Sequence, residues 1–160
     1  MCAGQVLGVR LAMLGVRELG LDPVKDRKRM VTYVEIDRCM TDAVALVANC
    51  RLGKRALKFL DWGKVAATFV DLQTQRAIRV VAKESAKQKA REMFPELDRE
   101  QGQQKAYRVM PDEEMFERQW VRVVVKPEDL PGFKAPRVVC AQCGEGINFK
   151  REVVKEGRTL

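Results

Sequence analysis

Residues 126–137 contain three prolines and one glycine, so this stretch cannot belong to a regular helix or strand. It divides the chain into a long first part and a short last part. The first part is long enough to bury a core of its own. We therefore expect a core domain at residues 1–126, a proline-rich linker at residues 127–137 and a small module at residues 138–160.

The chain begins with the periodicity of an amphipathic helix. Leu7, Leu11 and Leu14 share one face of a helix that we expect over residues 4–20 and that ends at Gly20. Hydrophobic residues make up 46% of the chain, which is enough to form a core. Wholesale disorder is therefore excluded.

Extended patterns follow this helix. β-branched residues predict a strand over residues 30–36, and Thr41 or Asp42 can cap the short helix that comes next. Short turn-like segments then separate three further stretches, and we expect these stretches to form an antiparallel meander. The three strands are expected at residues 56–62, 65–72 and 76–83.

Charged helical patterns fill the next part of the chain. Two helices are expected at residues 84–94 and 97–110, and a proline with three acidic residues opens a third at residues 111–119. Residues 120–125 predict a last strand. Helices and mostly antiparallel strands in this order predict an α+β core, with helices packed on a mixed or antiparallel sheet.

The last part of the chain holds half of a zinc site. Cys140 and Cys143 are two residues apart and precede Gly144, which permits the tight turn of a zinc knuckle. A structural zinc site needs four ligands, but the chain has no histidine and residues 147–160 contain no cysteine. A metal-free turn is the alternative. A redox dithiol is disfavoured because the glycines that follow make a poor start to a helix.

Two further cysteines lie at the expected starts of helices. Cys2 and Cys39 are placed where a helix dipole stabilises a thiolate, and Arg38 adds positive charge. They are candidates for a metal site or a reactive pair, although free cysteine is often only a small buried apolar residue. Asp37 and Asp42 flank Cys39 and could orient a ligand or move a proton, or serve as cap and turn residues. Cys39 and these two aspartates form our candidate catalytic cleft.

The remaining candidates are weaker. Cys50 follows the end of a helix and is expected to be structural. Lys54 and Lys64 each follow a glycine and could hold an anionic cofactor group, although an exposed hairpin lysine gives the same pattern. The spacing of a P-loop is absent. Without histidine, a cysteine nucleophile would also lack its usual base.

The formal charge of +8 raises the alternative of a basic module that binds nucleic acid through its zinc knuckle. Aromatic residues are only 6% of the chain and none lies within the basic clusters, so stacking platforms are lacking and nucleic acid is disfavoured. No apolar run approaches the roughly 20 residues of a membrane span, and no signal peptide is expected. Unpaired thiols fit a cytoplasmic protein. The basic clusters comprise Lys25, Arg27, Lys28, Arg29, Lys83, Lys87, Lys89 and Arg91.

Three stretches together resemble the formylmethanofuran dehydrogenase E-subunit family: "CAGQVLGVRLAMLG", "EIDRCMTDAVALVANCRLGKRALKFLDWGKVAATF" and "PRVVCAQCGEGI". The resemblance implies an α+β core, a small C-terminal zinc-ribbon-like module, a homodimer, and a core cleft with cysteine motifs that forms a metal or active site. The matching cysteines are Cys2, Cys39 and Cys50, and the matching polar positions are Asp37, Asp42, Lys54, Asp61 and Lys64.

The chain departs from the family pattern at both ends. The family's first motif resembles H-G-H-x-C-x-G, whereas this chain begins Met1-Cys2-Ala3-Gly4. Family members also continue to a second C-x-x-C. We expect that both ends are clipped inside a motif and that the zinc-ribbon-like module is incomplete. The alternative is that a partner chain, or Cys2 and Cys39 across a dimer interface, completes the site.

The resemblance implies a metal-binding accessory protein of one-carbon metabolism or of molybdenum- or tungsten-enzyme metabolism. Zinc is the expected metal, with Cys2, Cys39, Cys140 and Cys143 as its ligands. The chain would act as a homodimer or within a larger dehydrogenase complex. Independent catalysis does not follow, because the redox chemistry of such an enzyme belongs to other subunits with their own cofactors.

Overall fold

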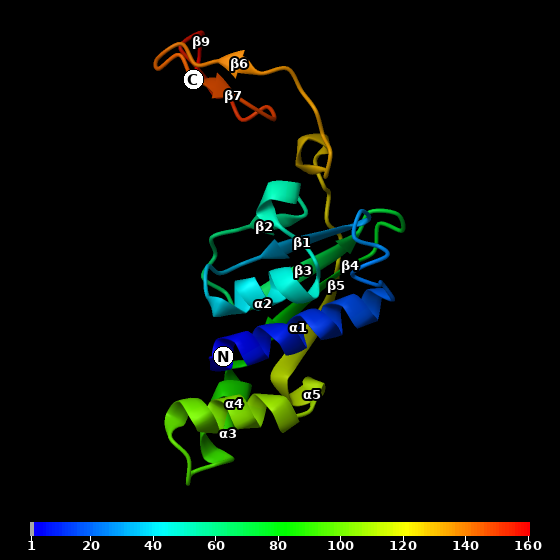
Figure 1. Cartoon of the computed structure of the whole chain (residues 1–160), viewed down its shortest axis with the longest axis vertical. Helices are drawn as coiled ribbons and strands as arrows, with labels where there is room; N and C mark the ends of the chain where they lie inside the picture. The colour runs from blue at the N-terminus through cyan, green and yellow to red at the C-terminus, as the bar shows by residue number, and fades with distance from the viewer. Residues whose placement is uncertain (1) are drawn as a thin grey trace. The chain divides into compact units, whose positions relative to one another are not determined.

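The computed structural model describes residues 2–160. The chain forms two compact units, Met1–Val123 and Val124–Leu160, each of which is described by itself below. Figure 1 labels the helices and strands of both units.

The first unit begins with the expected amphipathic helix, α1 (Ala3–Leu19). Leu7, Leu11 and Leu14 are buried on one face, as their spacing predicts. Gly20 ends the helix with φ 67° and its backbone N–H bonded to the last turn. Both bounds of this helix therefore follow from local sequence.

A five-stranded mixed sheet carries the rest of the core, in the order β2-β1-β3-β4-β5. β1 pairs with β2 in parallel, and every other neighbouring pair is antiparallel. The α+β fold with a mixed sheet is confirmed. The strands are β1 (Met30–Val34), β2 (Leu57–Phe59), β3 (Ala66–Asp71), β4 (Ala77–Ala82) and β5 (Phe116–Val121).

The expected meander of three consecutive strands is wrong. β3 and β4 do form an antiparallel hairpin, but β2 lies on the far side of β1 and never pairs with β3. The reason is the helix α2 (Cys39–Val47), which lies between β1 and β2 in the chain. A helical crossover of this length returns the chain parallel to its starting strand. A single turn of 3₁₀ helix, η1 (Leu52–Lys54), precedes β2.

The start of α2 also differs from expectation. Arg38 is the N-cap residue, and no side chain caps the helix. Thr41 lies inside the helix instead, where its hydroxyl donates to the Ile36 carbonyl. Cys39 is therefore the first residue of the helix rather than a residue before it.

Three helices connect β4 to β5. The expected helices α3 (Glu84–Glu92) and α4 (Arg99–Val109) are confirmed, and Asp98 caps α4 by accepting from two backbone N–H groups. The third, α5 (Asp112–Met115), is a single turn, because Phe116 already pairs with Ala82 in the sheet. The last strand thus begins four residues earlier than expected.

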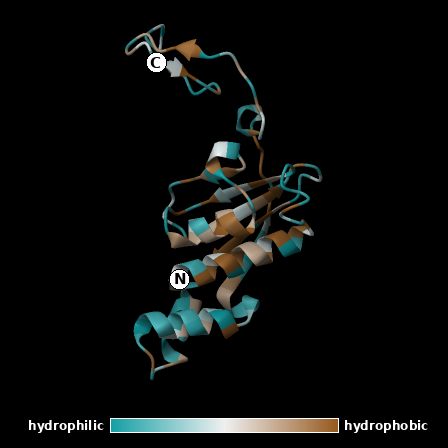
Figure 2. Ribbon diagram, viewed as in Figure 1, coloured by the Kyte–Doolittle hydropathy of each residue, from teal (hydrophilic) through white to brown (hydrophobic). Residues whose placement is uncertain are grey.

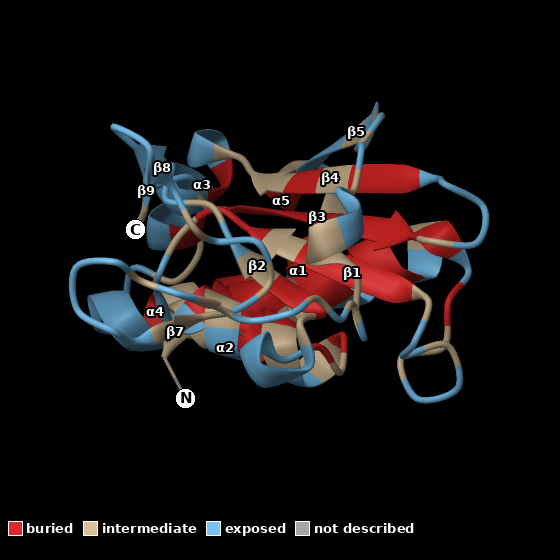
Figure 3. Cartoon of the chain, turned by 90° about the horizontal axis from the view of Figure 1, so that it is seen from above, coloured by how far each residue is buried: buried red, intermediate tan, exposed pale blue. Residues whose placement is uncertain are grey.

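The core lies between α1 and the sheet, and α2 packs beside α1. Figure 2 shows apolar residues concentrated on α1 and the strands, whereas α3 and α4 are mostly hydrophilic. Figure 3 shows the same distribution as burial, with β3 buried along its length. Gly15 is required here, because a Cβ on it would lie 2.2 Å from the ring of Phe69.

One carboxylate at the end of β3 is held by several donors. Asp71 accepts from Arg29 Nε at 3.0 Å and from Arg29 Nη2 at 2.7 Å. Thr74 and the backbone N–H of Gln73 donate to it as well. The hydrogen bonds from Arg29 hold the pKa of Asp71 far below its usual range.

We expect the Asp71→Asn variant to lose about 2 kcal/mol of stability at pH 7, the scale of hydrogen bonds to a charged group. Because the folded pKa of Asp71 is depressed, this stabilisation is complete above about pH 5 and is lost progressively as the pH falls below about 4. Urea unfolding of both proteins between pH 7 and pH 3 measures it. A difference in stability that stays constant over this range would contradict the assignment.

The second unit contains the linker and two small hairpins. Pro127–Asp129 forms a turn of 3₁₀ helix, η2, and no other helix or strand precedes β6 in the described part of this unit. Arg151 forms an ion pair with Asp129. The hairpins consist of β6 (Val138–Val139) with β7 (Gly146–Ile147), and of β8 (Val154–Lys155) with β9 (Arg158–Thr159).

Candidate functional site

The first turns of α1 and α2 lie side by side because Gly8 lets the two helices approach closely. A Cβ on Gly8 would lie 2.6 Å from the Met40 carbonyl oxygen and 2.9 Å from the Ala43 Cβ. Only glycine fits this contact. The approach brings the N-terminal ends of both helices, and therefore Cys2 and Cys39, to one place.

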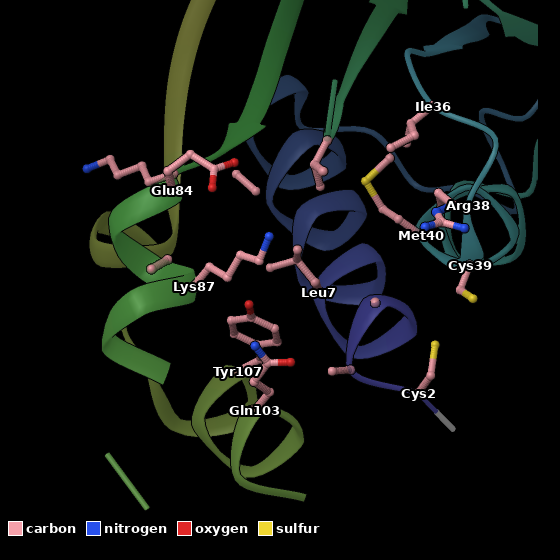
Figure 4. A pocket seen from close by; sticks show the side chains of 16 residues that line it. Cys2, Leu7, Ile36, Arg38, Cys39, Met40, Glu84, Lys87, Gln103 and Tyr107 are labelled. Atoms are coloured by element: carbon pink, nitrogen blue, oxygen red, sulfur yellow. The ribbon is translucent and has the colours of Figure 1, made fainter. Parts of the chain in front are cut away.

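Cys2 and Cys39 form a thiol pair at this point. Both lie against Gly4, where a built Cβ would be 3.8 Å from Cys2 Sγ and 3.7 Å from Cys39 Cβ. The two side chains share a hydrogen bond. Figure 4 shows both sulfur atoms between the first turns of the two helices. Two cysteines that are distant in sequence thus meet in the folded core domain.

The two thiols differ in their readiness to ionise. The backbone N–H of Gln5, at the start of α1, lowers the pKa of Cys2. The hydrogen bond with Cys2, followed by the charge of Cys2, raises the pKa of Cys39. Cys2 therefore carries the thiolate and Cys39 keeps its proton. The sequence had favoured a thiolate at both helix starts, but two adjacent thiols cannot both ionise easily.

A cavity of about 430 Å³ opens beside the thiol pair. Cys2 and Cys39 line one part of it, and side chains from α3 and α4 line another. Sequence reasoning did not place α3 and α4 at this site, although Lys87 belonged to one of the basic clusters. The lining side chains from these helices include Glu84, Lys87, Gln103 and Tyr107.

A second cavity, of about 330 Å³, also reaches Cys39. Asp37 and Asp42 line it together with Arg38 and Cys39. The structure therefore brings the three residues of the expected cleft to one place. Cys2 is not part of this second lining, so the cysteine that the two cavities share is Cys39.

Lys54 and Lys64 lie elsewhere. Both are exposed, and neither lines the two cavities that contain Cys39. The Lys64 ammonium lies 6.0 Å from the centre of the Trp62 ring. Cys50 is buried, and burial raises the pKa of its thiol. Its surroundings fit the structural role expected for it.

In the second unit, Cys140 and Cys143 lie in the turn between β6 and β7. Gly144 follows with φ 75°, as the knuckle turn requires. The backbone N–H groups of Cys143 and Gln142 lower the pKa of Cys140. Each of the two cysteine pairs supplies two thiols, and nowhere in residues 2–160 do three or more His, Cys, Asp or Glu side chains gather to hold a metal ion.

Carboxylates and carbonyls occupy part of the basic clusters. Arg29 is bound to Asp71. Lys83 donates to the Glu113 carbonyl, and Lys89 pairs with Glu114. A continuous free basic stripe is thus interrupted. Within the described chain, no helix combines the length and apolarity needed to cross a membrane.

Comparison with known proteins points to one family. The model of the FmdE family, described as "FmdE, Molybdenum formylmethanofuran dehydrogenase operon", matches residues 1–130. The match covers the thiol pair and both cavities.

Two individual proteins are also similar. A probable S-adenosyl-L-methionine-binding protein from Archaeoglobus fulgidus is 30% identical over 184 residues, which cover 99% of this chain and 48% of the relative. The chain thus spans about half the length of that relative. The crystal structure of an FmdE-like protein from Syntrophus aciditrophicus, described by its likeness to a tungsten formylmethanofuran dehydrogenase, aligns with a TM-score of 0.64 and 26% identity. The alignment covers 91% of this chain and 77% of the other.

Proposed function

Because this chain belongs to the FmdE family, we propose that it is a metal-binding accessory protein of one-carbon metabolism or of molybdenum- or tungsten-enzyme metabolism. Its core metal ligands are Cys2 and Cys39. The observation that carries this proposal is the meeting of these two thiols at the starts of α1 and α2, where Cys2 has a lowered pKa. A thiolate is the form of cysteine that binds metal.

The chemistry of the donors favours a soft ion such as zinc. Thiolates select zinc over magnesium or calcium, and C-x-x-C turns are common halves of zinc sites. The described residues supply two ligands in the core and two at Cys140 and Cys143, so each pair fits half of a tetrahedral site. In our proposal the other ligands come from a partner, either a second copy of this chain or a larger dehydrogenase complex.

Cys39, Asp37 and Asp42 remain the candidates for a reactive cleft. Asp42 contributes to raising the pKa of Cys39, so this thiol would act as a proton donor or a ligand rather than as the first nucleophile. Asp37 and Asp42 line the cavity that Cys2 does not reach, and their carboxylates could orient a ligand there. We do not propose independent catalysis.

Metal content tests the proposal. We expect the wild-type protein, purified from zinc-supplemented medium, to contain zinc by inductively coupled plasma mass spectrometry. The double variant Cys2→Ser/Cys39→Ser should lose the core share, and Cys140→Ser/Cys143→Ser the other, because serine is a poor zinc ligand. Light scattering on the same samples reports whether the zinc-containing species is a dimer.

The buried thiol provides the matched control. Cys50→Ala removes a cysteine that lies in neither pair and should leave the zinc content unchanged. Zinc that persists in full in both double variants would sink the proposal, as would a wild-type protein that takes up no zinc at micromolar concentrations.

A further inference from the structure

Three helices begin at the larger cavity. Its lining includes the first residues of α1 and α2 and also Lys83 and Glu84, where α3 starts. A helix N-terminus presents unbonded N–H groups and a partial positive charge, and three such ends add in the same direction. No side chain caps α2 or α3 at these ends. The backbone of the cavity is therefore suited to a negative group.

The charged side chains point the same way. Arg38, Lys83 and Lys87 are the basic residues of the lining, and Glu84 is its acidic residue. Lys83 is bound to the Glu113 carbonyl. Lys87, by contrast, has no partner within residues 2–160, and Figure 4 shows its amine directed into the cavity from α3. One ammonium group is thus available to a ligand.

Tyr107 supplies an independent observation. This α4 side chain is only 6% exposed, and its hydroxyl makes no hydrogen bond to any described residue. Figure 4 shows the hydroxyl directed into the cavity, beneath the amine of Lys87. A largely buried hydroxyl without a partner is unfavourable, and such groups are rare in native proteins. Burial also raises the pKa of Tyr107, so the hydroxyl stays protonated and can donate.

The remaining surface of the cavity is apolar. Leu7, Ile36, Val65 and Ala82 are among its lining residues. We infer that this cavity binds a small organic anion whose carboxylate or phosphate is held by Lys87, Tyr107 and the helix N-termini, with a short apolar body against the apolar side chains. This anion site goes beyond the proposed function and requires no metal at Cys2 and Cys39.

Four probes of one series test it on the metal-free full chain by isothermal titration calorimetry. Hexanoate and hexyl phosphate carry the two anionic groups, hexanamide lacks the charge, and inorganic phosphate lacks the apolar body. We expect saturable binding of at least one of the two anionic hexyl compounds, about tenfold or more tighter than hexanamide, as loss of a charge-assisted hydrogen bond predicts. The tighter of the two identifies the head group.

Point variants assign the binding to this cavity. Tyr107→Phe keeps the buried ring and should weaken the preferred probe about tenfold, and Lys87→Gln at least as much. Lys28→Gln removes the same charge from an exposed residue outside the lining and should leave binding unchanged. Equal affinity for hexanamide and the anions, or wild-type binding by both cavity variants, would overturn the inference, as would the absence of saturable binding.

The thiol variant separates this inference from the proposed function. Cys2→Ser/Cys39→Ser keeps the helix starts, Lys87 and Tyr107, so it should bind the preferred probe within about twofold of wild type even where it loses zinc. A protein that binds zinc but none of the probes would leave the metal proposal standing and refute the anion site. A protein that binds the anion without zinc would do the reverse.

Discussion

Replacing Arg79 by methionine is expected to lower the free energy of unfolding by about 3–5 kcal/mol, because it leaves a buried carboxylate without its counter-charge. Arg79 Nε and Nη2 each donate to Glu35 at 2.7 Å, and Arg79 Nη1 donates to Gln119 at 2.9 Å. The Glu35 side chain is 1% exposed and the Arg79 side chain 18% exposed. Chemical denaturation at pH 7 gives the difference directly.

Two matched proteins make this prediction sharp. Arg118 pairs with Glu18 at 3.1 Å, but the side chains are 41% and 25% exposed, so Arg118→Met should cost less than about 1 kcal/mol. The double variant Glu35→Leu/Arg79→Met removes both buried charges and should recover most of the loss. If Arg79→Met costs no more than Arg118→Met, the buried pair does not stabilise the sheet.

Gly8→Ala is expected to lower the free energy of unfolding by about 2 kcal/mol, as overpacking in a closely packed core does. The added methyl group meets the Met40 carbonyl at 2.6 Å, and backbone cannot move aside as a flexible side chain can. The helices α1 and α2 must separate, and the hydrogen bond between Cys2 and Cys39 should be lost with them. The variant therefore tests stability and site geometry together.

Gly4→Ala is the matched control. A Cβ on Gly4 meets its nearest neighbours at 3.7 and 3.8 Å, which is ordinary contact, and alanine favours the helix by up to about 1 kcal/mol over glycine. The rate of thiol modification against pH reports the site. We expect the lowered pKa of Cys2 to persist in Gly4→Ala and to move toward its usual value in Gly8→Ala. Equal stability of both variants would show that the close approach of the helices is unimportant.

The correct and incorrect predictions of the fold divide along one line. The start and end of α1 follow from residues that are neighbours in sequence: Leu7, Leu11 and Leu14 for the buried face, and Gly20 for the end. The predicted position of β2 was wrong, since strand pairing is chosen by packing across the whole sheet. Strand β5 also begins earlier than predicted, because Phe116 has a partner in Ala82 that no local pattern indicates.

The candidate site divides in the same way. That Cys2 and Cys39 lie at helix starts is a local property, which periodicity and the resemblance to a family were enough to predict. Tertiary packing was needed to show which thiol carries the charge, and that Lys87 and Tyr107 face the cavity beside the pair. Side chains on α1, α2, α3 and α4 are distant in sequence, and their meeting depends on how the helices pack, which short-range patterns do not encode.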